Sequence, residues 1–131
     1  MSFDMFVQAF RDGNAEPMPA AAFLEVFGPH VETTEPDKRY WQIHAPDGGR
    51  ADIYASIIEQ GIDSVLLNHF SSGDVLDLVV EFARKAGAVI MPVGCPILLV
   101  DGSQGRHLPE HLQDAVHLVA TGDDVLVSFN A

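Results

Sequence analysis

The first ten residues alternate in the manner of a strand. In an extended chain, one side carries Phe3, Met5, Val7 and Ala9, and the other carries Asp4, Phe6, Gln8 and Phe10. The sequence Arg-Asp-Gly-Asn at 11–14 is rich in turn formers and predicts the end of this strand.

Helical spacing and stop signals predict one strong helix, at 75–86, and two short ones. The first spans 20–27, between Pro19 and the stop signal Gly28-Pro29. The second spans 75–86, with an apolar stripe, a Glu81–Lys85 pair and a terminating Gly87. Ser71 or Ser72 is the expected cap of this second helix. A third, short helix is expected at 109–115.

A hairpin is predicted from 40–45 and 51–57 around the turn Pro46-Asp47-Gly48-Gly49. We assume a three-residue loop, 47–49, with Gly49 left-handed. This loop pairs Ile43 with Ile53 on the apolar face and His44 with Asp52 on the polar face. The same register pairs Trp41 with Ala55, Ala45 with Ala51, Gln42 with Tyr54, and Tyr40 with Ser56. A slip of one residue would mix apolar and polar side chains on both faces.

The remaining strands complete an α+β prediction. Residues 30–39 are polar and predict a short strand or loop, and 64–70 predict a strand. The apolar runs 88–93 and 97–100 predict central strands joined at Gly94-Cys95-Pro96, and 116–129 predict one or two terminal strands. The expected fold is a single domain, 1–131, with two layers: a mostly antiparallel sheet and helices packed on one face. The expected core includes Phe3, Val7, Trp41, Ile43, Ile53, Leu66, Val79, Phe82, Ile90, Leu98 and Val100.

Charge restricts the class of partner. The 131 residues include 7 Lys plus Arg and 19 Asp plus Glu, a net charge of −12, and 47% are hydrophobic. That hydrophobic content is typical of a folded domain rather than a disordered chain. The acidic excess argues against binding to nucleic acid or to an anionic membrane, because both need clustered Lys and Arg. It favours a basic partner, although scattered acidic residues also serve solubility alone.

Cysteine content and apolar segments suggest a cytoplasmic protein. Cys95 is the only cysteine, so neither an intrachain disulfide nor a multi-cysteine zinc site is expected. The start of the chain lacks the cationic and apolar regions of a secretory signal. The longest uncharged stretch, 86–100, is interrupted by Gly and Pro, and a spanning helix needs about 20 apolar residues. No cofactor is implied.

The hairpin carries the most reactive set of side chains. A carboxylate such as Asp52 can fix the tautomer of His44 for acid–base chemistry, with Tyr54 or Tyr40 as a hydrogen-bond donor. An exposed cross-strand His–Asp pair also forms without any catalytic purpose, and that structural reading is the expectation. Tyr40, His44, Asp52 and Tyr54 are therefore candidate binding residues, and no catalytic residue is assigned.

Three further features of the sequence carry candidate chemistry. His107-Leu108-Pro109-Glu110-His111 has the H-x-x-E-H spacing of some zinc proteases, but Pro109 would place the histidines outside one helix, so no metal site is predicted. Cys95 needs a nearby histidine or cation to act as a nucleophile and is expected as a small buried turn residue. Asn68, His69, Ser71 and Ser72 precede a helix, where anions bind, but capping is the expected role there.

Three segments carry a resemblance. Met1-Ser2-Phe3-Asp4, the hairpin Pro46-Asp47-Gly48-Gly49-Arg50-Ala51-Asp52-Ile53-Tyr54, and Gly87-Ala88-Val89-Ile90 resemble small uncharacterised bacterial proteins that open with M-S-F-D and carry P-D-G-G. In general type the chain is also similar to the immunity proteins that neutralise bacterial toxin domains. Neither resemblance brings a catalytic residue with it.

Three functional hypotheses follow from the sequence and are given in order of preference. The leading hypothesis is a non-enzymatic binding protein, of immunity or inhibitor type, whose partner is a basic, toxin-like protein domain. The alternative is a small acid–base enzyme, hydrolase-like, that uses His44, Asp52 and Tyr54. The third is a metal-dependent site at His107 and His111. Oligomeric state is left open.

Overall fold

The computed structural model describes residues 3–129. Met1 and Ser2, the first half of the M-S-F-D string, lie outside the described residues. The strands are β1 (Met5–Arg11), β2 (Asn14–Glu16), β3 (Val31–Glu35), β4 (Tyr40–His44), β5 (Arg50–Ile58), β6 (Gly61–Asn68), β7 (Val89–Pro92), β8 (Ile97–Leu99) and β9 (Val116–Leu118). The α-helices are α1 (Ala20–Phe27), α2 (Asp74–Ala86) and α3 (Gly122–Ser128). The 3₁₀ helices are η1 (Gly28–His30), η2 (Pro36–Lys38), η3 (Gly102–His107) and η4 (Glu110–Leu112).

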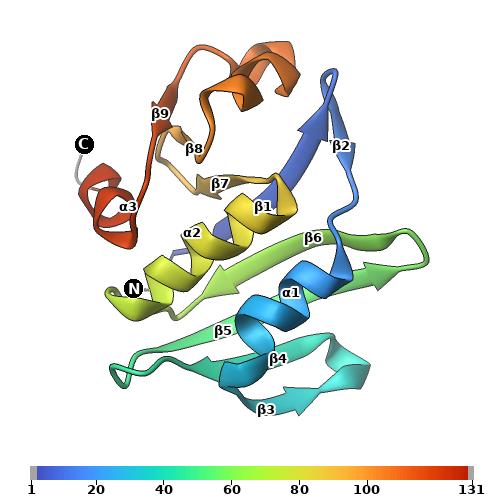
Figure 1. The fold of residues 1–131 in the computed structure, drawn as a ribbon, viewed down its shortest axis with the longest axis vertical. Coiled ribbons are helices and arrows are strands. Elements are labelled where there is room, and N and C mark those ends of the chain that lie inside the picture. Colours follow the sequence, from blue (N-terminus) through green and yellow to red (C-terminus); the bar gives the residue numbers. More distant parts are fainter. Residues whose placement is uncertain (1–2, 130–131) are drawn as a thin grey trace.

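The strands form one sheet in the order β3-β4-β5-β6-β1-β7-β8-β9. The remaining strand, β2, lies outside this order and pairs with β1. Within residues 3–129, every strand pair is antiparallel except β8 with β9. In Figure 1, α1 and α2 lie across the same face of the sheet. The α+β prediction of a mostly antiparallel sheet with helices is confirmed.

The main core lies between that face and the helices. Met5 and Val7 of β1 point into it, together with Phe23 and Phe27 of α1 and Phe82 of α2, all at most 2% exposed. Of the expected core, Phe3, Trp41 and Val100 are only partly buried against this cluster. Leu66 is a correction: its neighbours Val65 and Leu67 are fully buried, so Leu66 lies on the opposite face.

A second, smaller core covers part of the opposite face. Leu108 and Leu112, from the η3–η4 segment, pack with Val89 and Leu99 of β7 and β8. Leu108 is 1% exposed. The opposite face is thus covered at the β7–β8 end by short 3₁₀ helices. Among the described residues, no helix is both long and apolar enough to cross a membrane.

The hairpin register differs from the prediction by two residues. Ile43 faces Ala51 and His44 faces Arg50, whereas Asp52 faces Gln42. The cause is the loop: the Gly48 N–H donates to the Ala45 carbonyl at 2.9 Å, and Gly48, not Gly49, is left-handed at φ 87°. The loop therefore spans 46–48, one residue earlier than predicted. Moving a loop by one residue shifts the pairing by two, which leaves each side chain on its predicted face.

The end of the chain is a second correction. Only Val116–Leu118 form a strand, and α3 follows where a terminal strand was expected. Thr121 and Asp124 form a capping box, in which the Asp124 N–H donates to Thr121 Oγ1 at 3.2 Å and Asp124 Oδ2 accepts from the Thr121 N–H at 3.1 Å. The expected helix at 109–115 is reduced to the three-residue η4.

The strongest predicted helices are confirmed, with different supporting contacts. α1 spans the predicted residues, and α2 ends at Gly87, which is left-handed at φ 65°. Lys85 binds Glu25 of α1 at 3.1 Å rather than Glu81. Ser71 does not cap α2; its Oγ accepts a hydrogen bond from the Arg50 N–H at 3.0 Å.

Candidate functional site on the open face of the sheet

Asp52 is the centre of a polar cluster on the face of the sheet opposite α1 and α2, which we call the helix-free face because no α-helix within residues 3–129 lies on it. It lies in β5, and its Oδ1 accepts a hydrogen bond from Tyr40 Oη at 2.6 Å. Its other carboxylate oxygen lies 2.9 Å from Nδ1 of His69. One carboxylate thus holds a phenol and an imidazole in place. Of the predicted set, the structure brings Tyr40, Asp52 and Tyr54 together.

The Tyr40 phenol is a donor and stays protonated at neutral pH. Its hydrogen bond to Asp52 is the main cause that raises its pKa to about 12, and partial burial and the negative charge of Asp52 add to the shift. The Tyr54 ring lies beside it, with ring centroids 5.2 Å apart. The two tyrosines face each other across β4 and β5.

His69 occupies the position that sequence reasoning gave to His44. It follows the last residue of β6 and adopts a left-handed backbone at φ 47°. Positive φ is uncommon outside glycine, although histidine adopts it more readily than most residues. Because Asn68 pairs with Asp52 across β5 and β6, the next residue turns over the carboxylate. The predicted register hid this contact, since it placed Asp52 opposite His44.

His44 stands apart from the cluster. Its Nδ1 lies 3.7 Å from Glu32 Oε2 of β3, and its buried Nε2 has no hydrogen-bond partner within residues 3–129. The predicted His44–Asp52 pair is therefore wrong, for the register reason given above. His44 still shares the helix-free face with Tyr40, because the two residues are an even number of positions apart in β4.

An apolar row crosses the sheet beside this cluster, and sequence reasoning did not assemble it. Each member faces the next across adjacent strands: Tyr40 with Tyr54, Tyr54 with Leu66, Leu66 with Phe6, and Phe6 with Met91. We call these five residues the open-face stripe. Phe6 and Tyr54 are 37% and 38% exposed. The signal for it in the sequence was that the first strand carries apolar residues on both of its faces.

Polar residues border the stripe on both sides along β5, β6 and β1, whereas the residues two positions from Met91 of β7 are the apolar Val89 and Val93. One neighbouring row contains Gln42, Asp52 and Asn68, and Asn68 Nδ2 reaches Asp4 Oδ1 at 3.5 Å. The other border contains Ser56, whose Oγ accepts a hydrogen bond from Arg39 Nη1 at 3.2 Å. Along these three strands the apolar surface is thus one side chain wide, with two carboxylates, Asp52 and Asp4, on one flank.

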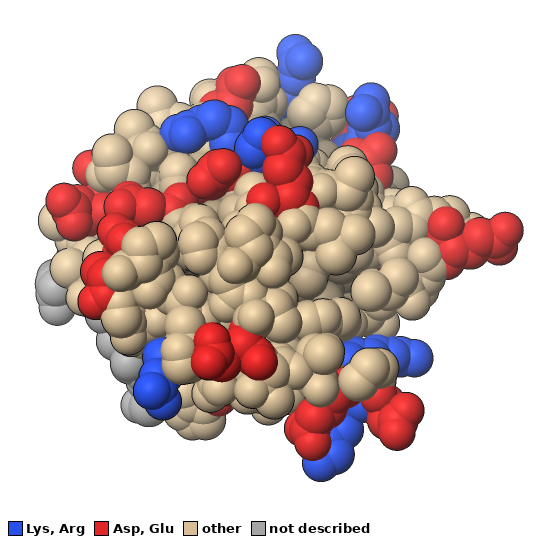
Figure 2. All heavy atoms as spheres, turned by 60° about the horizontal axis from the view of Figure 1, so that its bottom comes forward, with Lys and Arg blue, Asp and Glu red and all other residues tan. Residues whose placement is uncertain are grey.

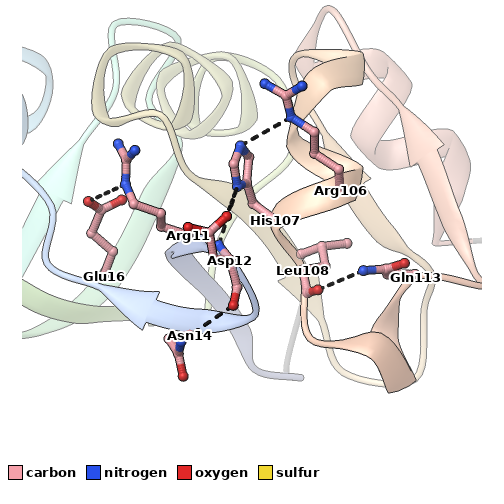
Figure 3. A network of polar contacts seen from close by, with 8 residues as sticks. All are labelled: Arg11, Asp12, Asn14, Glu16, Arg106, His107, Leu108 and Gln113. Carbon is pink, nitrogen blue, oxygen red and sulfur yellow. Dashed lines mark hydrogen bonds and ion pairs between the residues drawn. The ribbon is translucent and has the colours of Figure 1, made fainter.

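The H-x-x-E-H segment has a structural role. His107 ends η3 and His111 lies in η4, with an extended Leu108 between them, as the position of Pro109 predicts. Figure 3 shows His107 between Asp12 and Arg106: Nδ1 lies 3.5 Å from Asp12 Oδ1, and Nε2 accepts from Arg106 Nε at 3.3 Å. Within residues 3–129, no three His, Cys, Asp or Glu side chains are grouped to hold a metal ion.

Two cavities lie away from Asp52. The larger, about 480 Å³, is lined by residues that include Arg11, Arg84 and His107. Arg11 is paired there with Glu16 at 3.0 Å, and Arg84 donates to the Ala120 carbonyl at 3.1 Å. The smaller, about 270 Å³, lies beside β9 and α3. Both arginines in the larger cavity thus already hold contacts within the chain.

Cys95 lies in the turn between β7 and β8, where its N–H donates to the Pro92 carbonyl at 3.1 Å. The turn position expected from the sequence is confirmed, but Cys95 is only partly buried rather than buried.

The acidic residues are scattered over the face of the molecule drawn in Figure 2. Figure 2 shows Asp and Glu side chains in several small groups, separated by broad uncharged areas and interspersed with Lys and Arg.

Comparisons with protein-family models, with curated proteins and with solved structures found no match to this chain.

Proposed function

We propose that this chain is a small acidic binding protein of the immunity or inhibitor type, which acts in the cytoplasm on a basic, toxin-like protein domain. The observation that carries the proposal is the helix-free face around Tyr40 and Tyr54. These paired rings stand beside the carboxylate of Asp52, and Tyr54 is 38% exposed. Exposed aromatic side chains are the usual anchors of protein interfaces.

Charge supports a basic partner. The net charge of −12 gives the molecule a negative field that would attract a cationic domain and slow the approach of an anionic one. His44 and Asp52 would contribute polar contacts at the edge of the interface, while the two tyrosines supply the buried centre.

The test is capture from the source cell followed by mass spectrometry. The wild-type chain should retain a protein with a basic domain, and Tyr54→Ala should lose it. Leu24→Ala is the matched control, because Leu24 is an exposed apolar residue on α1, on the other side of the sheet. Retention by Tyr54→Ala at the wild-type level would contradict the proposal.

A small acid–base enzyme remains the second candidate because of one observation. Asp52 contacts both His69 and Tyr40, so it would orient the imidazole while the phenol donates a hydrogen bond. In this version His69 takes the role first given to His44. The cavities of about 480 and 270 Å³ lie elsewhere, which favours the binding protein. Hydrolysis of an activated ester that His69→Ala abolishes, at unchanged stability, would reverse this order.

A further inference from the structure

We infer that the open-face stripe receives a basic amphipathic α-helix of the partner, laid along the stripe and across the strands. This inference rests on the proposed function and specifies its contact surface. It extends the site from Tyr40 and Tyr54 to Leu66, Phe6 and Met91, which the candidate residues from the sequence did not include.

The width of the stripe favours a helix as the occupant. A second sheet packed on this face would bury the neighbouring rows as well, and those rows hold Asp52, Asn68 and Ser56. A single partner strand pairs at a sheet edge through its backbone rather than on a face. A helix presents a narrow apolar line with polar residues on either side, which matches the apolar row between two polar rows on β5, β6 and β1.

The length of the stripe fits the same occupant. Five adjacent strands at about 4.8 Å spacing give a stripe of about 19 Å, the length of about 13 helical residues. The helical pitch of about 5.4 Å is close to the strand spacing. One apolar side chain per turn would therefore meet about one strand each.

The chain already covers the adjoining surface in a similar way. Leu108, between the short helices η3 and η4, and Leu112 of η4 cover the β7–β8 end of this face. Met91 belongs to both surfaces: it is packed against that second core and is also the last member of the stripe. A partner helix would extend this cover toward β4.

Charge selects a basic helix over a second copy of the chain. Asp52 and Asp4 border one flank, so Lys or Arg on the partner helix would face carboxylates. Two copies meeting through this face would bring together chains that each carry −12. The stripe is therefore better matched to a cationic segment than to itself.

Two synthetic peptides of identical Leu and Lys composition test the inference. One places Leu with helical spacing, and the other alternates Leu and Lys as a strand. In NMR titrations of the full chain, the helical peptide should shift the amide signals of Phe6, Leu66 and Tyr54, and the alternating peptide should bind at least about tenfold more weakly. Equal binding by both peptides, or shifts confined to other surfaces, would overturn the inference.

Matched variants separate the stripe from general attraction between charges. Phe6→Lys should weaken the helical peptide at least about tenfold, while Leu24→Lys, which changes the charge equally, should not. Phe6→Gln, a milder change, repeats the test if Phe6→Lys does not fold. A dimer of the wild-type chain by sedimentation that Phe6→Lys dissociates would instead make a second copy the occupant and overturn the inference.

The two proposals fail in different ways. If Tyr54→Ala abolishes capture of the partner from the cell but Phe6→Lys leaves it intact, the binding function stands and the helix-across-the-strands arrangement is wrong. If neither variant affects capture, both are wrong.

Discussion

The carboxylate of Asp47, in the turn between β4 and β5, accepts a hydrogen bond from the backbone N–H of Asp74 at 3.0 Å, 27 positions along the chain. Asp74 is the first residue of α2, and the cap position, Gly73, supplies no side chain of its own. Asp47 also accepts from the Gly49 N–H at 2.9 Å. The P-D-G-G turn thus provides the helix cap that sequence reasoning assigned to Ser71 or Ser72.

Because of this contact, we expect the fold to lose stability at acid pH. The hydrogen bond from Asp74 is the first cause that lowers the pKa of Asp47 below its usual 3.8, and the bond from Gly49 is the second. A carboxyl with a depressed folded-state pKa stabilises the fold above the unfolded-state pKa, and the contribution is lost as pH falls through the folded-state pKa.

We therefore expect Asp47→Ala to lower the urea midpoint at neutral pH, and the gap from wild type to close below about pH 4. Asp114→Ala, a change at an exposed acidic residue, should leave the midpoint near wild type at both pH values. A gap that persists unchanged at pH 3 would show that Asp47 acts through something other than its charge.

A second prediction concerns the entry to β6. Gly61 has φ 134°, and a Cβ there would overlap the backbone carbonyl oxygen of Met18, which pairs with Ile62. Strain and overlap with a backbone atom together should cost about 2–4 kcal/mol in Gly61→Ala. In Gly102→Ala, where a Cβ meets open space, the free energy of unfolding should change by less than about 0.5 kcal/mol. Equal losses in urea denaturation would contradict this explanation.

Particular residues show how far the sequence could be interpreted. The bounds of α1 were predictable because Pro19 and Gly28-Pro29 mark both ends, and the amphipathic stripe of α2 ends at a glycine. The faces of β4 and β5 were predictable because alternation has period two, but their register depends on whether Gly48 or Gly49 is left-handed. The pattern allows either glycine, so the pairing of Asp52 could not be determined.

Contacts between distant segments were beyond local patterns. The Asp52–His69 contact joins residues 17 positions apart, and it follows only when the β5–β6 pairing is known. α3 was missed although Thr121 and Asp124 have capping-box spacing, because the apolar residues after them were interpreted as a strand. The open-face stripe could be identified only when the registers of four strand pairs were known together.

A third prediction uses the Tyr40–Asp52 hydrogen bond. The folded-state pKa of the Tyr40 phenol is raised to about 12 from 10.0. The contribution of this phenol to the stability of the fold is therefore fully present below pH 10 and is lost as pH rises toward 12. Tyr40→Phe should lower the free energy of unfolding by about 1 kcal/mol at pH 7. In a phenolate absorbance titration, Asp52→Asn should ionise Tyr40 at lower pH than wild type. An unchanged titration would show that Asp52 does not control this phenol.

A fourth prediction tests the role of His44. His44→Ala should change the free energy of unfolding by less than about 1 kcal/mol, because the contact with Glu32 is long and partly exposed. In the part of the chain that the structure describes, the buried Nε2 has no hydrogen-bond partner, so removing the ring also removes an uncompensated polar atom. A loss well above 1 kcal/mol in urea denaturation would mean that packing of the ring matters more than its polar contacts.

The last prediction concerns association with the basic partner once it is captured. Scattered surface charges act over about 8 Å at physiological ionic strength, so they steer approach more than they hold the complex. Raising salt from about 50 mM to about 500 mM should therefore slow association markedly and change dissociation less. Tyr54→Ala should mainly speed dissociation, because the ring beside Tyr40 is an anchor rather than a charge. Stopped-flow or biosensor kinetics separate the two rates. An association rate indifferent to salt would remove the electrostatic part of the proposal, and unchanged dissociation of Tyr54→Ala would remove the aromatic part.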